Sequence, residues 1–88
     1  MSDVRRVLHE AADLIEDHGW IRDDFYGPNG EFSLMGAISE VASHYDDPRG
    51  VKGDCYEELR DRLGVSLISQ WEEEEARDAE DVMSTLRM

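Results

Sequence analysis

Cysteine, proline and long apolar runs are all scarce in this chain of 88 residues. A single cysteine, Cys55, excludes an internal disulfide and fits the reducing conditions of a cytoplasm. No apolar stretch approaches the roughly 20 residues of a membrane span. Acidic residues also interrupt the N-terminal segment where a signal peptide would be apolar. We therefore expect a cytoplasmic protein with no membrane partner.

Basic residues are also few. Nine Lys and Arg residues against 22 Asp and Glu residues leave a formal net charge of -13. Such a surface repels nucleic-acid backbones and anionic membranes, because affinity for both depends on Lys and Arg. We therefore expect no direct nucleic-acid binding, whereas a basic protein partner is favoured. The alternative is that the acidic surface serves only to keep the protein solvated.

The residue patterns of metal sites and catalytic sites are missing. His9, His18, His44 and Cys55 could bind zinc, but none of them falls into a close ligand pair. No loop has the spacing of a calcium-binding EF-hand, and the G-x-S-x-G pattern of a nucleophilic serine is absent. We expect no metal, no cofactor and no enzymatic activity. Catalysis by paired carboxylates remains an alternative, because 22 acids bring some carboxylates close together.

Helical periodicity is what the sequence does show. Apolar residues recur at helical spacing from Val4 to Ile15, which predicts a helix over about residues 3–18 that Gly19 ends. Ser33 is placed to cap a second helix. Gly36, in the first turn of that helix, would let a neighbouring helix come close.

The second half of the chain predicts two more helices. Proline and glycine residues predict a loop of about eight residues over positions 46–53. Asp54 and Glu57 then have the spacing of a capping box that opens a third helix. Residues 67–71 offer one further apolar turn, and Asp78 is placed to cap a last helix. The predicted fold is all-α, a small compact bundle of about four short helices in one domain, residues 1–88.

Residues 20–32 connect the first two predicted helices. The turn sequence YGPNGEF predicts an ordered loop, with a short hairpin as the alternative form. Trp20, Phe25 and Tyr26 can hold this loop against the helices or contact a partner. An anion site is not expected here, because Pro28 removes a backbone amide and no Lys or Arg lies among residues 24–32.

Several segments, in their order and spacing, carry a resemblance to known sequences. They are LHEAADLIEDHGW, GEFSLMGAI, an L-x-x-x-L-G helix end, the tryptophan at position 71 and RDAEDVMSTL. In these segments the chain resembles a family of small uncharacterised proteins from actinobacteria and their bacteriophages, a domain of unknown function. The resemblance covers about residues 8–86. The family pattern is G-W, then G-x-x-C-L-x-G-A, then W-N-D, then R-T.

The chain keeps most of this pattern and departs from it at four positions. The residues that match are Gly19, Trp20, Leu34, Gly36, Ala37, Trp71 and Arg77. Ser33 replaces the cysteine, Glu72 and Glu73 replace the Asn-Asp pair, and Asp78 replaces the threonine. The missing cysteine argues against a thiol or metal role at that position. The resemblance implies no activity, but it implies a phage origin and a protein that binds host proteins.

These observations predict a small acidic, non-enzymatic protein of phage type that binds a host or phage protein, in the cytoplasm of a bacterial host. Candidate partner-binding residues are Trp20, Phe25, Tyr26, Glu72, Glu73, Glu74 and Glu75. Candidate structural residues are Gly19, Ser33, Gly36, Trp71, Arg77 and Asp78. One alternative is a DNA mimic that inhibits a nucleic-acid-binding protein. Another is a self-associating structural protein, since a homodimer would enlarge a small core.

Overall fold

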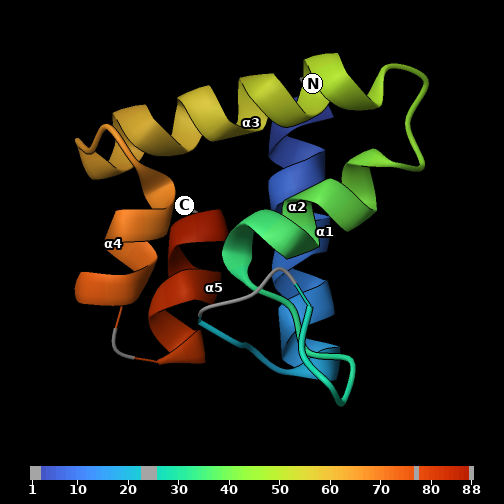
Figure 1. The fold of residues 1–88 in the computed structure, drawn as a ribbon. Coiled ribbons are helices and arrows are strands. Elements are labelled where there is room, and N and C mark those ends of the chain that lie inside the picture. Colours follow the sequence, from blue (N-terminus) through green and yellow to red (C-terminus); the bar gives the residue numbers. More distant parts are fainter. Residues whose placement is uncertain (1–2, 23–25, 77, 88) are drawn as a thin grey trace.

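The structure is a computed structural model that describes residues 3–22, 26–76 and 78–87. This part of the chain contains five helices. They are α1 (Asp3–His18), α2 (Leu34–Ala42), α3 (Pro48–Leu63), α4 (Ile68–Glu74) and α5 (Ala79–Arg87) (Figure 1). No strand is assigned within these ranges, so the all-α prediction is confirmed. The predicted number of about four helices is corrected to five, because residues 68–74 form a helix of their own.

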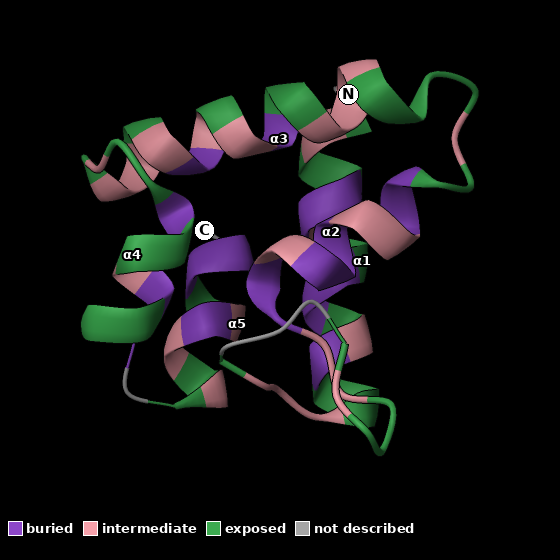
Figure 2. Ribbon diagram, in the orientation of Figure 1, coloured by how far each residue is buried: buried purple, intermediate pink, exposed green. Residues whose placement is uncertain are grey.

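The helices pack around a single core. The Cα radius of gyration is 11.7 Å, close to the ~12 Å of a compact chain of this length. Helix α1 contacts α2, α3 and α5, and α3 crosses one end of the molecule (Figure 1). The buried residues face inward from all five helices (Figure 2). The largest fully buried side chains are Leu8, Ile15, Leu34, Ile38, Leu59 and Leu86.

Helix α1 has the bounds that its periodicity predicts. Its buried side comprises Val7, Leu8, Ala11, Ala12 and Ile15, at the spacing of one helical face. The helix ends at Gly19, which has a φ of 95° and donates its N–H to the Ile15 carbonyl at 2.8 Å. Glycine adopts this conformation without the strain that a Cβ would introduce.

Helix α2 begins after a serine cap. Ser33 Oγ accepts a hydrogen bond from the Gly36 N–H at 3.0 Å, which satisfies one donor at the start of the helix. Gly36 itself is buried in the first turn. The first turn of α2 is therefore ordered where it follows the loop of residues 19–33.

Helix α3 begins seven residues earlier than predicted, with its cap at Asp47 in place of Asp54, so the expected loop over residues 46–53 is wrong. Pro48 occupies the first turn, where proline needs no hydrogen-bond partner and its fixed φ suits a helix. Asp47 is the N-cap, and its carboxylate accepts from the Gly50 N–H at 3.3 Å. Asp54 and Glu57, the predicted capping box, lie inside the helix and are exposed.

The connection between α1 and α2 is closed by backbone hydrogen bonds. Gly27 N–H donates to the Glu31 carbonyl at 2.8 Å, and Gly30 N–H donates to the Gly27 carbonyl at 3.3 Å. Gly30 has a φ of 88°, as in a three-residue hairpin turn. Phe32 N–H donates to the Gly19 carbonyl at 3.0 Å. The described loop is therefore ordered as predicted, with a hairpin-type turn and isolated bridges in place of a strand ladder.

Candidate functional site

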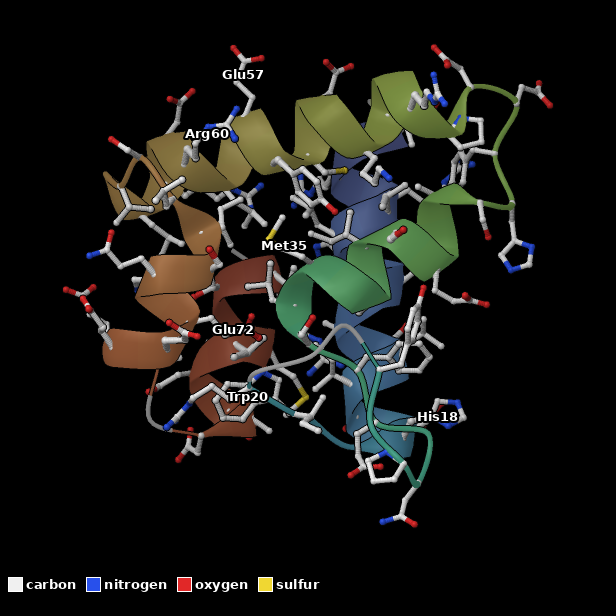
Figure 3. All side chains as sticks on the ribbon, in the orientation of Figure 1. His18, Trp20, Met35, Glu57, Arg60 and Glu72 are labelled. Carbon is white, nitrogen blue, oxygen red and sulfur yellow. The ribbon has the colours of Figure 1, made fainter. Side chains whose placement is uncertain are left out.

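A buried carboxylate joins three segments of the fold. Glu72, in α4, has 3% of its surface exposed. Its Oε2 accepts hydrogen bonds from Trp20 Nε1 at 2.6 Å and from the Leu34 backbone N–H at 2.7 Å. Figure 3 shows the Glu72 carboxyl group close to the Trp20 indole. The contacts tie the segment after α1 and the start of α2 to α4.

The expectation that Glu72 belongs to an acidic surface is corrected by this burial. Ile68 and Glu72 are four positions apart in α4 and both are buried, so this face of α4 points into the core, and Ala76 beyond the helix end is buried as well. Burial disfavours the charged form and raises the pKa of Glu72 above its ordinary value of 4.5, while the two hydrogen bonds lower it in part. Both bonds come from donors of the same chain, which makes this carboxyl group part of the framework.

Trp20 also has its partners within the chain. Its indole N–H is bonded to Glu72, and the Arg22 guanidinium carbon lies 5.0 Å from the centre of its ring. Arg22 Nη2 in turn donates to the Ala76 carbonyl at 2.8 Å. Trp20 is only half-buried, but its polar atom and the face of its ring already have partners within the chain.

Tyr26 is the exposed aromatic residue of the described loop. It is 52% exposed and packs edge-on against Phe32, with ring centroids 5.6 Å apart. Phe32 makes a second edge contact with His18 at 5.6 Å, which fixes the loop against the end of α1. Phe25, the other predicted loop aromatic, lies outside the described residues.

A shallow groove runs along the outer side of α4. Its volume is about 200 Å³, and it is lined by Val65, Leu67, Gln70, Trp71, Glu74 and Glu75. Leu67 is 60% exposed, although it belongs to the apolar turn that the sequence offers at residues 67–71. It is the residue before α4, and the register that buries Ile68 turns Leu67 outward. The exposed position of Leu67 was missed because the apolar run alone gives no register.

The groove brings together three of the predicted residues. Trp71, Glu74 and Glu75 line it, and Gln70 Nε2 donates to Glu74 Oε2 at 3.3 Å. Glu73 is exposed but does not line this groove. The four consecutive glutamates thus have different surroundings: one is buried, two line the groove and one lies beside it.

Three of the remaining structural candidates lie at helix ends. Asp78 Oδ1 accepts from the Asp81 N–H at 3.0 Å in the first turn of α5, as a capping side chain does. Gly19 ends α1, and Ser33 caps α2. Arg77 lies outside the described residues. Gly19, Ser33 and Asp78 thus mark the ends of α1, α2 and α5.

The described chain has further polar groups in its interior and in a second groove, including the buried His9 Nε2, which has no hydrogen-bond partner. Burial raises the pKa of the Cys55 thiol to about 12, which leaves it protonated and unreactive. A groove of about 540 Å³ between the starts of α1 and α3 carries Asp3, Arg6, Asp46 and Asp54 among its lining residues. Within the described ranges, no three His, Cys, Asp or Glu side chains are grouped to hold a metal ion.

Each helix in the described ranges is too short or too polar to cross a bilayer.

Comparison with known proteins gives a family and no activity. No curated protein and no solved structure matches the chain. The match that was found extends over residues 1–88, and the function of the matching family is unknown. The chain belongs to the family of unknown function DUF6197.

Proposed function

We propose that this protein is a small, acidic, non-enzymatic binding protein of phage type, which binds a host or phage protein in the cytoplasm of a bacterial host. The proposal rests on the surface of the folded chain and on the resemblance to small proteins of actinobacteria and their phages. The partner has an apolar contact surface and basic side chains around it.

The observation that carries this proposal is a pair of exposed apolar side chains on an acidic surface. Tyr26 and Leu67 are 52% and 60% exposed, and both are held on ordered parts of the described chain. Exposed aromatic and aliphatic side chains on rigid elements supply binding energy at interfaces because little conformational freedom is lost on binding. The exposed carboxylates of the protein, among them Glu74 and Glu75 beside Leu67, attract a basic partner and repel an acidic one.

DNA mimicry receives less support from the positions of the carboxylates. A mimic needs its carboxylates in an array that repeats the phosphates of a duplex. The exposed acids lie on the outer sides of α1, α3, α4 and α5 and in the segment before α3. Glu72, one of the four consecutive glutamates, is buried and adds no charge to such an array. A partner that recognises one local surface fits this distribution better.

Affinity capture tests the proposal. The folded protein is immobilised and exposed to a lysate of an actinobacterial host, with and without phage infection, over a range of salt concentrations. We expect one or a few retained proteins, each of which binds the purified chain in a two-component titration. The proposal is overturned when no retained protein binds the purified chain at any salt concentration.

The variant Tyr26→Ser combined with Leu67→Ser serves as the control. Both side chains are exposed, so the variant is expected to keep the fold, which circular dichroism checks. Loss of the captured protein with this variant assigns the binding to the exposed apolar side chains. Capture that is unchanged assigns it to another surface and removes the observation on which the proposal rests.

A further inference from the structure

The outer side of α4 has the composition of a docking site for a basic helix. Leu67, Trp71 and Glu74 recur at positions i, i+4 and i+7, so they lie along one side of the helix. The opposite side, with Ile68 and Glu72, is buried in the core. The groove therefore lies on an element that is anchored by its other face and presents a fixed surface.

The groove is lined by apolar side chains and by a rim of two glutamates. Leu67 is largely exposed and Trp71 is partly buried against the core, and together with Val65 they supply the apolar contacts. Glu74 and Glu75 supply the carboxylates. Residues 65–76 contain four glutamates and no Lys or Arg, so no basic side chain of this segment neutralises the rim.

The size of the groove limits what it can accept. Its volume of about 200 Å³ is below the ~300–1,000 Å³ of pockets that enclose small-molecule ligands. A shallow groove of this size accepts one or two apolar side chains of a larger partner. An amphipathic helix supplies such anchors at i, i+3, i+4 and i+7 and carries basic side chains beside them.

We infer that the α4 groove binds a basic amphipathic helix of a partner protein. An apolar residue of that helix sits between Leu67 and Trp71, and its Lys or Arg side chains face Glu74 and Glu75. A second copy of this chain is a poor occupant, because two chains of charge -13 repel each other. The inference rests on the proposed function and adds the surface and the chemistry of the partner to it.

A synthetic helix tests this directly. The probe is a 16-residue peptide with Leu at i, i+3, i+4 and i+7 and Lys and Ala elsewhere. A scrambled peptide of the same composition and a peptide with Glu in place of Lys are the comparisons. We expect the probe to bind at least about tenfold more tightly than either, because the scramble loses the apolar stripe and the Glu peptide is repelled.

Substitutions in the groove separate the contribution of its apolar contacts to probe affinity from that of general charge attraction. Leu67→Ser is expected to weaken probe binding about tenfold, since it removes an exposed apolar contact. Glu74→Gln with Glu75→Gln is expected to weaken it about fivefold at 50 mM NaCl and less at 300 mM NaCl, because rim charges are screened by salt. Glu73→Gln, the exposed neighbour outside the groove, is the matched control and should change the affinity less than twofold.

Nuclear magnetic resonance locates the bound probe. Binding should shift the indole N–H signal of Trp71, which lines the groove, and leave that of Trp20, whose N–H is bonded to the buried Glu72. Equal binding of the scrambled peptide, or Leu67→Ser with unchanged affinity, overturns the inference. The inference is also overturned if light scattering detects a dimer that Leu67→Ser dissociates, since the occupant of the groove would then be a second copy of the chain.

The two proposals fail differently. A captured partner that tolerates Leu67→Ser but is lost with Tyr26→Ser leaves the proposed function in place and removes the groove as its site. Absence of any captured partner removes the proposed function, whatever the probe does.

Discussion

Glu72 shows how the surroundings of one carboxyl group decide its role. It lies within a run of four glutamates, and its neighbours Glu73, Glu74 and Glu75 are exposed. Its own carboxylate is 3% exposed and receives hydrogen bonds from Trp20 and Leu34. A buried carboxylate is stable only where donors replace the water that it loses. At the residue scale, then, the same side chain serves as framework at one position and as surface at the next three.

Removing the Glu72 carboxylate should destabilise the fold. Glu72→Ala leaves the Trp20 and Leu34 donors without their acceptor, and we expect a loss of about 2–4 kcal/mol in the free energy of unfolding. Glu72→Gln keeps an acceptor oxygen and should lose about 1 kcal/mol. Urea denaturation followed by circular dichroism measures both. Glu73→Ala is the control and should change the free energy by less than about 0.5 kcal/mol. Equal effects at positions 72 and 73 would contradict the buried placement.

The pH dependence of the Trp20 indole signal should report the raised pKa of Glu72. Protonation of the carboxyl group weakens the bond from Trp20 Nε1, so the indole N–H resonance should move with a midpoint above 4.5. Because the folded protein takes up this proton at a higher pH than the unfolded chain, Glu72 contributes more stability as pH falls through the folded pKa towards 4.5. That contribution is lost as pH rises. In Glu72→Gln the titration should be absent, and a midpoint at or below 4.5 in the wild type would be inconsistent with desolvation.

At the element scale, α3 shows which of two sequence signals for a helix start is used in the fold. Asp54 and Glu57 have the spacing of a capping box, whereas Asp47 is a cap residue followed by a proline at the first helical position. The structure uses Asp47, because Pro48 suits the first turn and Asp47 can then bond the Gly50 N–H. The glycines at 50 and 53 are therefore helical residues, not loop residues.

The two caps can be compared by substitution. Asp47→Ala removes the observed cap of α3 and should lower the free energy of unfolding by about 1 kcal/mol. Asp54→Ala replaces an exposed residue inside the helix with a better helix former, so it should leave stability unchanged or raise it by about 0.5 kcal/mol. Thermal and urea denaturation of the two variants measure the difference. The reverse order would place the start of the helix at Asp54.

The same elements show what sequence could and could not predict. The bounds of α1 followed from its apolar stripe and Gly19, and Ser33 marked the start of α2. The start of α3 was missed because a proline and two glycines favour a loop unless the cap is recognised. The burial of Glu72 could have been found from its spacing of four from Ile68 and Ala76. This burial was not predicted, because a glutamate in an acidic run is ordinarily a surface residue.

The candidate site was predicted only in part for a related reason. The acidic residues and Trp71 were identified as candidates, but the groove also depends on Val65 and Leu67, which lie in the connection between α3 and α4. Burial lowers the free energy of every apolar side chain in the turn of residues 67–71, and only the helix register decides which of them is exposed.

At the scale of the whole molecule, excess negative charge opposes folding. Arg87 Nη2 lies 3.0 Å from Asp13 Oδ1 and 2.7 Å from Glu16 Oε2, and it links α5 to α1. Arg62 is paired with Glu58 within α3 at 3.2 Å. These exposed or partly exposed pairs are screened by salt. The 22 acidic and nine basic residues still leave most carboxylates facing others of the same sign. The compact state brings them closer together than the unfolded chain does.

Salt should therefore stabilise this protein. Between 20 and 300 mM NaCl the Debye length falls to well below ~10 Å, so repulsion among the exposed carboxylates is screened more than the few ion pairs are. We expect a gain of about 1 kcal/mol in the free energy of unfolding, which corresponds to a rise in Tm of about 4–8 °C for a domain of this size. Thermal denaturation over this salt range measures this gain.

A variant with Glu57→Gln, Asp61→Asn and Glu73→Gln removes three exposed negative charges. It should melt at a higher temperature in low salt, and its Tm should respond less to added salt. A Tm that falls as salt is added would mean that the ion pairs of Arg87 and Arg62 outweigh the repulsion among the carboxylates.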